Sequence, residues 1–212
     1  MTEKGRITMK FTKIKKMIVM GLAAMTAVSA MSMSAFAAEE NLVAELEDSN
    51  GNIVSVYEDD LIDGRYSIES DGLTITVEVK PASDLFAARA LSKTFTTMKP
   101  YYPVDLDANG TQSLSFSASK LDTVYSPYLY VSSGSKKVVY DFAADDKYNT
   151  SVKGTVIVQD SSGQIEEKNY SVSLGDTKSH SVTISGLSST QTTYASVYNG
   201  YKSDISGTCR VF

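Results

Sequence analysis

Apolar and polar residues alternate with a period of two along most of the chain from residue 42 onward. In the segment LTITVEV, Leu73, Ile75 and Val77 share one face, and Thr74 and Thr76 share the other. Successive side chains of a β-strand point to opposite faces of its sheet, so such a segment has one face for a core and one for solvent. The same alternation appears in QSLSFSAS, KGTVIVQ, NYSVSLG, HSVTISG and ISGTCRVF.

Short turn-forming motifs separate these segments, among them DSNGN at 48–52, SSGS at 132–135 and YNGY at 198–201. Many short strands between regular turns, without helical periodicity, are typical of a sandwich or barrel. The sequence therefore predicts an all-β protein. We expect an antiparallel β-sandwich of about eight or nine short strands over residues 93–212. A small β-hairpin unit at 38–80 precedes it, and residues 81–92 connect the two.

The N-terminus has the composition of a secretory signal peptide. A basic cluster that includes Lys15 and Lys16 precedes the apolar run MIVMGLAAMTAVSAM, and Ala35 and Ala37 occupy the small-residue positions before a cleavage site. These features predict a signal peptide at residues 1–37, with Met9 as an alternative start, and it is similar to those of Gram-positive bacteria. A transmembrane anchor is the alternative, but a bilayer span needs about 20 apolar residues, and serines interrupt this run.

Charge and cysteine content narrow the possible partners. Residues 1–37 hold six of the 20 Lys and Arg residues and one of the 25 Asp and Glu residues, which leaves 14 against 24 and a net charge near −10. That balance disfavours nucleic acid, whose binding depends on neutralising phosphates. The single cysteine, Cys209, lies far from the cleavage site and cannot form an internal disulfide. We expect a secreted, extracellular protein without a lipid anchor, and no transmembrane segment after cleavage.

The central part of the chain resembles a known kind of module. The stretch SFSASKLDTVYSPYLYVSSGSKKVVYDF looks like the strand pattern of sandwich modules that are appended to secreted bacterial hydrolases. The likeness covers about 100 residues and consists of the strand pattern alone. It therefore implies a sandwich fold and carries no function with it.

Signatures of catalysis are scarce, and we predict no catalytic residue. His180 is the only histidine, so a Ser-His-Asp or Cys-His arrangement must use it, and its place after the turn-like DTKS predicts an exposed position. Cys209 is expected to face the core as a small buried hydrophobe. The acidic pairs at 59–60, 145–146 and 166–167 consist of adjacent residues, which point to opposite faces of a strand. Such pairs cannot by themselves form the facing carboxylates of a glycosidase.

One motif has the oxygen ligands that a hard cation prefers. DLDANG places Asp105, Asp107, Asn109 and Gly110 at the first, third, fifth and sixth positions of a calcium loop. It resembles the start of an EF-hand loop, but Phe116 stands at the twelfth position, where a bidentate Glu is needed. The alternative is a turn between strands built from residues that favour turns. Calcium is the one cofactor that the sequence suggests.

Tyrosines beside prolines form the other candidate site. KPYYPVD sets Tyr101 and Tyr102 between two prolines, and VYSPYLY holds Tyr125 and Tyr128 around Pro127. Rigid aromatic rings are low-entropy contact points for a protein or a sugar. Sugar-stacking platforms commonly use tryptophan, which this chain lacks.

These features favour an exported, non-enzymatic β-sandwich protein that binds a protein, a glycan or another copy of itself at the cell surface. A small secreted hydrolase or an enzyme inhibitor is the first alternative. A deep pocket with converging acidic groups, or His180 beside a Ser and an Asp, would favour the hydrolase. A structural protein that assembles through an uncovered edge strand is the second alternative. The sequence leaves open whether residues 38–92 are a domain, a pro-segment or a linker.

Overall fold

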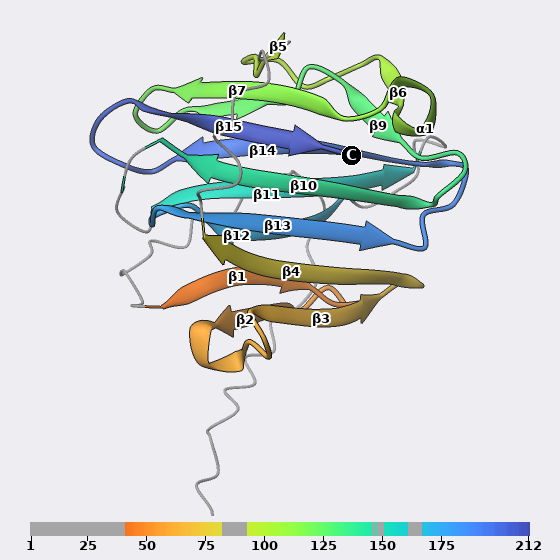
Figure 1. The fold of residues 1–212 in the computed structure, drawn as a ribbon, viewed down its shortest axis with the longest axis horizontal. Helices are drawn as coiled ribbons and strands as arrows, with labels where there is room; N and C mark the ends of the chain where they lie inside the picture. The colour runs from red at the N-terminus through yellow and green to blue at the C-terminus, as the bar shows by residue number, and fades with distance from the viewer. Residues whose placement is uncertain (1–40, 82–92, 146, 148–150, 161–166) are drawn as a thin grey trace, which may run out of the picture. The chain divides into compact units, whose positions relative to one another are not determined.

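Two β-sheets packed together make up the described part of the chain in the computed structural model (Figure 1). The structure describes residues 41–81, 93–145, 147, 151–160 and 167–212. The predicted signal peptide at 1–37 and residues 82–92 of the predicted connector lie outside the described residues. In the described ranges, no helix is long and apolar enough to cross a membrane.

The first sheet has the strand order β2-β1-β12-β11-β14-β9-β6, with β8 also paired to β14. Its strands are β1 (Leu42–Glu47), β2 (Ile53–Tyr57), β6 (Pro103–Asp105), β8 (Thr123–Tyr125), β9 (Leu129–Val131), β11 (Val152–Asp160), β12 (Lys168–Ser173) and β14 (Gln191–Asn199). We call it the eight-stranded sheet.

The second sheet has the strand order β3-β4-β13-β10-β15-β7-β5. Its strands are β3 (Arg65–Ser70), β4 (Leu73–Pro81), β5 (Lys93–Thr94), β7 (Gln112–Ala118), β10 (Lys137–Ala144), β13 (Lys178–Ser185) and β15 (Ile205–Val211). We call it the seven-stranded sheet. Two single-turn helices, η1 (Glu58–Asp60) and α1 (Leu106–Asn109), lie in the connections.

The predicted all-β sandwich is confirmed, with two differences of detail. Neighbouring strands are antiparallel except for β5 beside β7 and β6 beside β9, which are parallel. Residues 93–212 also contain eleven described strands, β5 to β15, which is two or three more than expected. Four of the eleven, β5, β6, β8 and β9, are only two or three residues long. A segment of that length is too short to show an alternating pattern.

The two N-terminal hairpins join different sheets. Strand β1 pairs with β12, so the β1–β2 hairpin extends the eight-stranded sheet. Strand β4 pairs with β13, so the β3–β4 hairpin extends the seven-stranded sheet. Both hairpins therefore lie at the end of the strand order opposite to β5 and β6 (Figure 1).

The core lies on the faces that the alternation predicts. Leu73, Ile75 and Val77 of β4 are buried, and the intervening threonines are partly exposed. Cys209 of β15 is fully buried as a free thiol, and this burial raises its pKa well above the ordinary value. A thiol that is buried and protonated behaves as a small hydrophobe.

A column of aromatic side chains crosses the middle of the core. The ring of Tyr140 contacts that of Tyr130 edge-on at a centroid distance of 6.0 Å and stacks on that of Phe142 at 6.3 Å. The hydroxyl groups of Tyr140 and Thr193 share a hydrogen bond of 2.8 Å, which links β10 of one sheet to β14 of the other. Aromatic contacts of this kind add about 0.5–1.5 kcal/mol each beyond the burial of area.

Two glycines let aromatic rings lie directly against the backbone. A Cβ atom on Gly207 would stand 2.3 Å from Cζ of Phe116 and 2.3 Å from the carbonyl oxygen of Ala143. A Cβ atom on Gly154 would stand 3.0 Å from the ring of Phe142. Glycine within a strand weakens the strand, and here it makes room for a ring that the core needs.

Candidate functional site

Three of the four most exposed large apolar side chains of the described residues lie in one loop. Residues 97–102, here called the aromatic loop, connect β5 to β6. Met98, Tyr101 and Tyr102 are 75%, 81% and 69% exposed, and the two tyrosine rings meet edge-on at 5.4 Å. Single exposed apolar residues are ordinary, whereas a group of large ones marks an interaction site.

The residues before the aromatic loop attach it firmly to the sandwich. Phe95 is buried, and its ring contacts the ring of Phe116 at 5.9 Å. The backbone of Thr96 donates a hydrogen bond to Tyr125 and accepts one from it, at 2.8 and 2.7 Å. The Thr96 hydroxyl also donates to the carbonyl oxygen of Met98 at 3.0 Å. The loop therefore leaves the fold from a fixed point.

The side chain of Lys99, in the middle of the aromatic loop, attaches this loop to the eight-stranded sheet. The ammonium of Lys99 lies 3.0 Å from a carboxylate oxygen of Glu167 and 5.9 Å from the centre of the Tyr194 ring. Burial alone would lower the pKa of Lys99, but the interactions with Glu167 and Tyr194 outweigh it and raise that pKa. Burial raises the pKa of Tyr194 to about 12, so its hydroxyl stays protonated and donates to Glu167.

The four tyrosines named from the sequence take two different positions. Tyr101 and Tyr102 lie together on the surface in the aromatic loop. Tyr125 is half-buried, with its ring 6.4 Å from that of Tyr194. Tyr128 is half-buried too, and the ammonium of Lys93 donates to its hydroxyl and lies 4.9 Å from its ring centre. Tyr125 and Tyr128 are thus packed beside the strands that support the loop.

The predicted calcium residues form the single-turn helix α1 and hold a neighbouring loop. Asp105 caps this helix and accepts hydrogen bonds from the Asp107 backbone and from the Ser133 hydroxyl. One oxygen of Asp107 accepts from the Ser132 hydroxyl at 3.0 Å and from the Gly134 amide at 2.9 Å. The Asn109 side chain donates to the backbone carbonyl of Asp105. These hydrogen bonds are those of a turn, and calcium binding at Asp105, Asp107 and Asn109 stays a prediction.

Substitution of Asp107 gives a pH-dependent test of this turn. The Gly134 amide, with the Ser132 hydroxyl, lowers the pKa of Asp107. A lowered pKa means that the carboxylate stabilises the fold above its unfolded pKa of about 3.9 and that this contribution is lost as the pH falls through the folded pKa. We therefore expect Asp107→Asn to melt at a lower temperature than the wild type at neutral pH and at the same temperature in strong acid. An equal deficit at both pH values would contradict this role.

Melting curves with added calcium and with excess chelator, on the same two proteins, test the metal hypothesis separately. A cation that binds only the folded state raises the melting temperature of the wild type. The expected signature of a calcium site is a rise in the wild type that Asp107→Asn abolishes.

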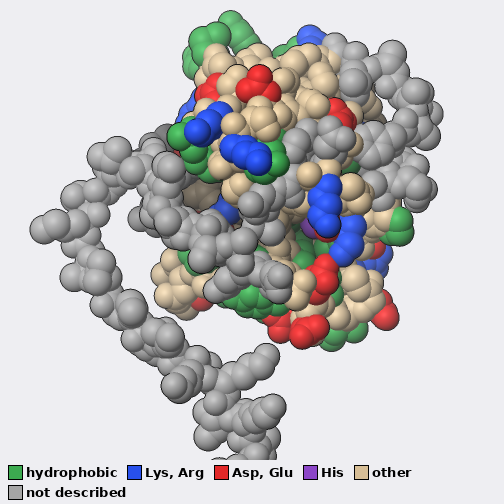
Figure 2. Space-filling view, turned by 90° about the vertical axis from the view of Figure 1, so that its left-hand side faces the viewer, with side chains coloured by type: hydrophobic (Ala, Val, Ile, Leu, Met, Phe, Trp, Pro, Cys, Tyr) green, Lys and Arg blue, Asp and Glu red, His purple; other side chains and the backbone are tan. Residues whose placement is uncertain are grey.

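His180 is buried, which corrects the expectation of an exposed histidine. It is 3% exposed, because it falls on the core-facing side of β13 together with Val182 and Ile184. Figure 2 shows only a small area of histidine side chain at the surface, next to Lys and Arg side chains. Its Nε2 atom lies 2.7 Å from a carboxylate oxygen of Asp176. Burial alone would raise the pKa of Asp176, but the hydrogen bond to His180 and the other interactions outweigh burial and lower that pKa. The turn motif gave the correct strand start, but only the strand register decides which face His180 occupies.

No nucleophile accompanies this His-Asp pair among the described contacts. Nδ1 of His180 has no hydrogen-bond partner in the described part of the chain, and the neighbouring Ser179 and Ser181 lie on the opposite face of β13. Within the same residues, no group of three or more His, Cys, Asp or Glu side chains could hold a metal ion. Asp59 and Asp60 lie in the exposed helix η1, whereas Asp146 and Glu166 fall outside the described residues.

Two features of the site were not recognised in the sequence. Met98 is the only methionine after residue 37. Its place in the run TMKPYYP, beside two prolines and two tyrosines, could have indicated a third exposed apolar side chain in this loop. The ion pair of Lys99 with Glu167 joins residues far apart in sequence, so no local pattern could reveal it.

Comparison with known proteins gives no further information on this surface. The chain matches no protein-family model, no curated protein and no solved structure.

Proposed function

We propose that the chain is an exported β-sandwich protein that acts by binding, with the aromatic loop as its contact surface and another protein as its partner. The observation that carries the proposal is the exposure of Met98, Tyr101 and Tyr102 on a loop that is attached at Thr96 and Lys99. A flexible loop would lose conformational entropy on binding, and an attached loop loses less. A tyrosine side chain also buries a large area on binding while only two rotatable bonds become fixed.

The geometry of the two tyrosines favours a protein partner over a flat polysaccharide surface. Their ring planes are 89° apart. A sugar chain lying on a flat platform stacks on rings that are coplanar, and here only one ring at a time could serve. Two perpendicular rings, on the same loop as a flexible exposed methionine, instead suit a pocket on a protein partner. A glycan partner stays an alternative outcome of the test below.

The test compares binding by residues 38–212 with binding by the double variant Tyr101→Ser/Tyr102→Ser. Each protein is immobilised and exposed to the secreted and surface proteins of the source organism, and in parallel to purified insoluble polysaccharides. Central aromatic residues contribute about 2 kcal/mol or more each to an interface, so we expect affinity for the captured protein to fall at least about 100-fold in the double variant. Leu121→Ser is the matched control, because Leu121 is 59% exposed at a different loop.

Three results separate the possibilities. Loss of protein capture in the double variant, with capture intact in Leu121→Ser, supports the proposal. Equal capture by the wild type and the double variant contradicts it. If the wild type binds polysaccharide instead of a protein, and the double variant does not, the aromatic loop is a glycan-binding loop.

A further inference from the structure

Oxidisable side chains are few in the part of the chain that follows the predicted signal peptide. After residue 37 the sequence contains two sulfur atoms, one in Met98 and one in Cys209, and no tryptophan. Peroxides convert a methionine thioether to a sulfoxide, and they attack cysteine as its thiolate. The two sulfur atoms are therefore the first places where an oxidant of this class could modify the chain. The structure places them in opposite surroundings.

The fold shields the sulfur atom of Cys209. This residue is fully buried in β15, which lies between β10 and β7 in the seven-stranded sheet, and it pairs there with Phe142 and Leu114. Burial raises the pKa of the Cys209 thiol well above its ordinary value, so the reactive thiolate is scarce. An oxidant that meets the folded protein therefore finds this thiol both covered and protonated.

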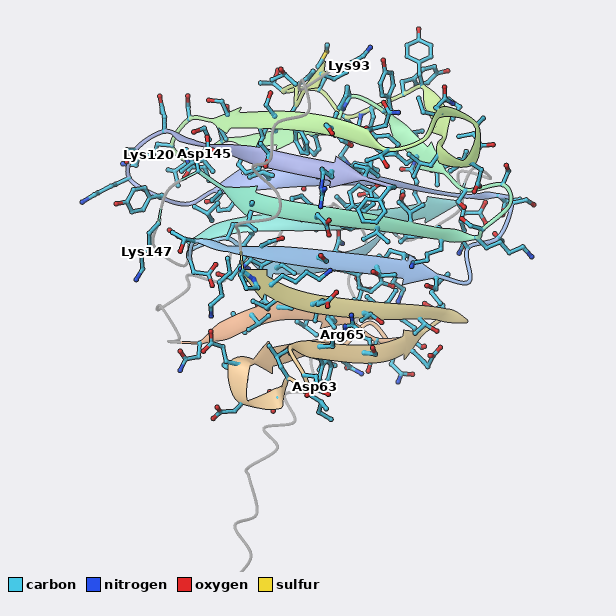
Figure 3. All side chains as sticks on the ribbon, in the orientation of Figure 1. Asp63, Arg65, Lys93, Lys120, Asp145 and Lys147 are labelled. Atoms are coloured by element: carbon cyan, nitrogen blue, oxygen red, sulfur yellow. The ribbon has the colours of Figure 1, made fainter. Side chains whose placement is uncertain are left out.

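The sulfur atom of Met98 belongs to a side chain that is open to solvent. Met98 is 75% exposed in the aromatic loop. Figure 3 labels Lys93, which begins the strand β5 that leads into this loop, at the upper edge of the molecule. The Met98 carbonyl oxygen accepts from the Thr96 hydroxyl, and the next residue, Lys99, pairs with Glu167. Neither of these contacts involves the sulfur atom, so an oxygen can be added to it without a change in the fold.

We propose that Met98 is a modification site, where a peroxide reversibly oxidises the thioether to a sulfoxide and thereby weakens binding by the aromatic loop. The sulfur lone pair attacks one peroxide oxygen, the O–O bond breaks, and an S–O bond forms. Sulfur loses two electrons, and the proton on the attacked oxygen passes to the other oxygen, which leaves as water or, from an organic hydroperoxide, as an alcohol. A dithiol reverses the step: it is oxidised to a disulfide, and the sulfoxide oxygen leaves as water.

The effect on binding rests on the proposed function of the aromatic loop. A thioether is a flexible apolar group that adapts to the surface of a partner. A sulfoxide oxygen is a polar acceptor, and burial of a polar group without a hydrogen bond is unfavourable. Tyr101 and Tyr102 stay unchanged, so the contact surface is weakened and not removed. We expect the affinity for a captured protein to fall at least about tenfold on oxidation.

Mass spectrometry of residues 38–212 after treatment with hydrogen peroxide tests the chemical step. We expect one added oxygen, on the peptide that contains Met98, with Cys209 unmodified and the melting temperature unchanged. The rate should be constant between about pH 5 and 8, because a thioether has no titratable proton, whereas a thiol reacts faster as the pH rises. Modification of Cys209 before Met98 overturns the proposal, and so does a lower melting temperature after one oxygen is added.

Retention on a phenyl matrix measures the change in the loop without a partner. The oxidised wild type should elute earlier than the reduced protein, and a methionine sulfoxide reductase supplied with a dithiol should restore the original elution. Met98→Leu is the matched variant, because peroxide should leave its retention unaltered, whatever that retention is. Equal retention of the oxidised and the reduced wild type overturns the proposal.

Capture of secreted and surface proteins measures the effect on binding. Leu121→Ser keeps Met98 and is the control, so it should lose affinity on oxidation to the same extent as the wild type. Equal affinity before and after oxidation, for a protein that Tyr101→Ser/Tyr102→Ser does not capture, overturns the proposal and leaves the proposed function standing. Capture that the double variant retains contradicts the proposed function instead, and the oxidation site is then judged by the mass and the phenyl retention.

Discussion

Replacement of Gly207 by alanine is expected to destabilise the protein by at least about 3 kcal/mol. The new Cβ atom would stand 2.3 Å from Cζ of Phe116 and 2.3 Å from the carbonyl oxygen of Ala143. The ring could turn away only into a filled core, and the carbonyl oxygen belongs to the backbone of β10. Both strands would have to move apart, which loses hydrogen bonds in the middle of the sheet. Equilibrium unfolding in denaturant, followed by circular dichroism, measures the loss.

A second substitution separates the two clashes at Gly207. Phe116→Leu removes the ring atom that the Cβ would meet but leaves the Ala143 carbonyl in place. The double variant Phe116→Leu/Gly207→Ala should therefore remain less stable than Phe116→Leu alone. Ser117→Ala, on the exposed face of the same strand, is the control and should change stability by less than about 0.5 kcal/mol. A wild-type unfolding midpoint for Gly207→Ala would show that the strands approach less closely than described.

Truncation of Phe142 to alanine is expected to lower the free energy of unfolding by about 4 kcal/mol. Its ring is fully buried, stacks on Tyr140 and lies against the backbone of Gly154 in the opposite sheet. Removing it leaves a cavity between the two sheets and ends the aromatic column. The measurement is denaturant unfolding of the single variant against the wild type.

Because the Phe142 ring lies against Gly154, we expect that the effects on stability of substituting these two residues will not be additive. In the wild type, Gly154→Ala places its Cβ 3.0 Å from the Phe142 ring and is expected to destabilise by about 1–2 kcal/mol. In the Phe142→Ala background the same methyl group enters the cavity and should be neutral or stabilising. Additive effects of the two substitutions would show that the ring and the glycine do not touch.

The sequence predicted the fold well where a strand is long enough to show its own pattern. The alternation in β4 and β15 assigned Leu73, Ile75 and Cys209 to the core, where the structure has them. Gly207 lies on the same face of β15 as Cys209, two residues along the strand. The alternation could not reveal that the ring of Phe116 covers this glycine, since cross-strand pairing joins residues far apart in the chain.

The candidate site was predictable only in part, for the same reason. Prolines beside Tyr101 and Tyr102 indicated rigid exposed rings, and both are exposed. Tyr125 and Tyr128 also lie near a proline, but both side chains are half-buried. A proline marks a loop but does not decide whether neighbouring strands cover that loop. His180 shows the same limit, since its exposure depends on the register of β13 against β4 and β10.

The division of the N-terminal hairpins between the two sheets has a consequence for the order of folding. Ala44 pairs with Val172, about 130 residues later, and Val77 pairs with Val182, about 105 residues later. The first strands to be synthesised thus cannot complete their sheets until most of the chain is available. Such high contact order predicts folding in milliseconds to seconds rather than microseconds. We therefore expect the two sheets to be incomplete until β12 and β13 have been made, and a chain whose sheets are incomplete is easier to thread through a narrow pore than a finished sandwich.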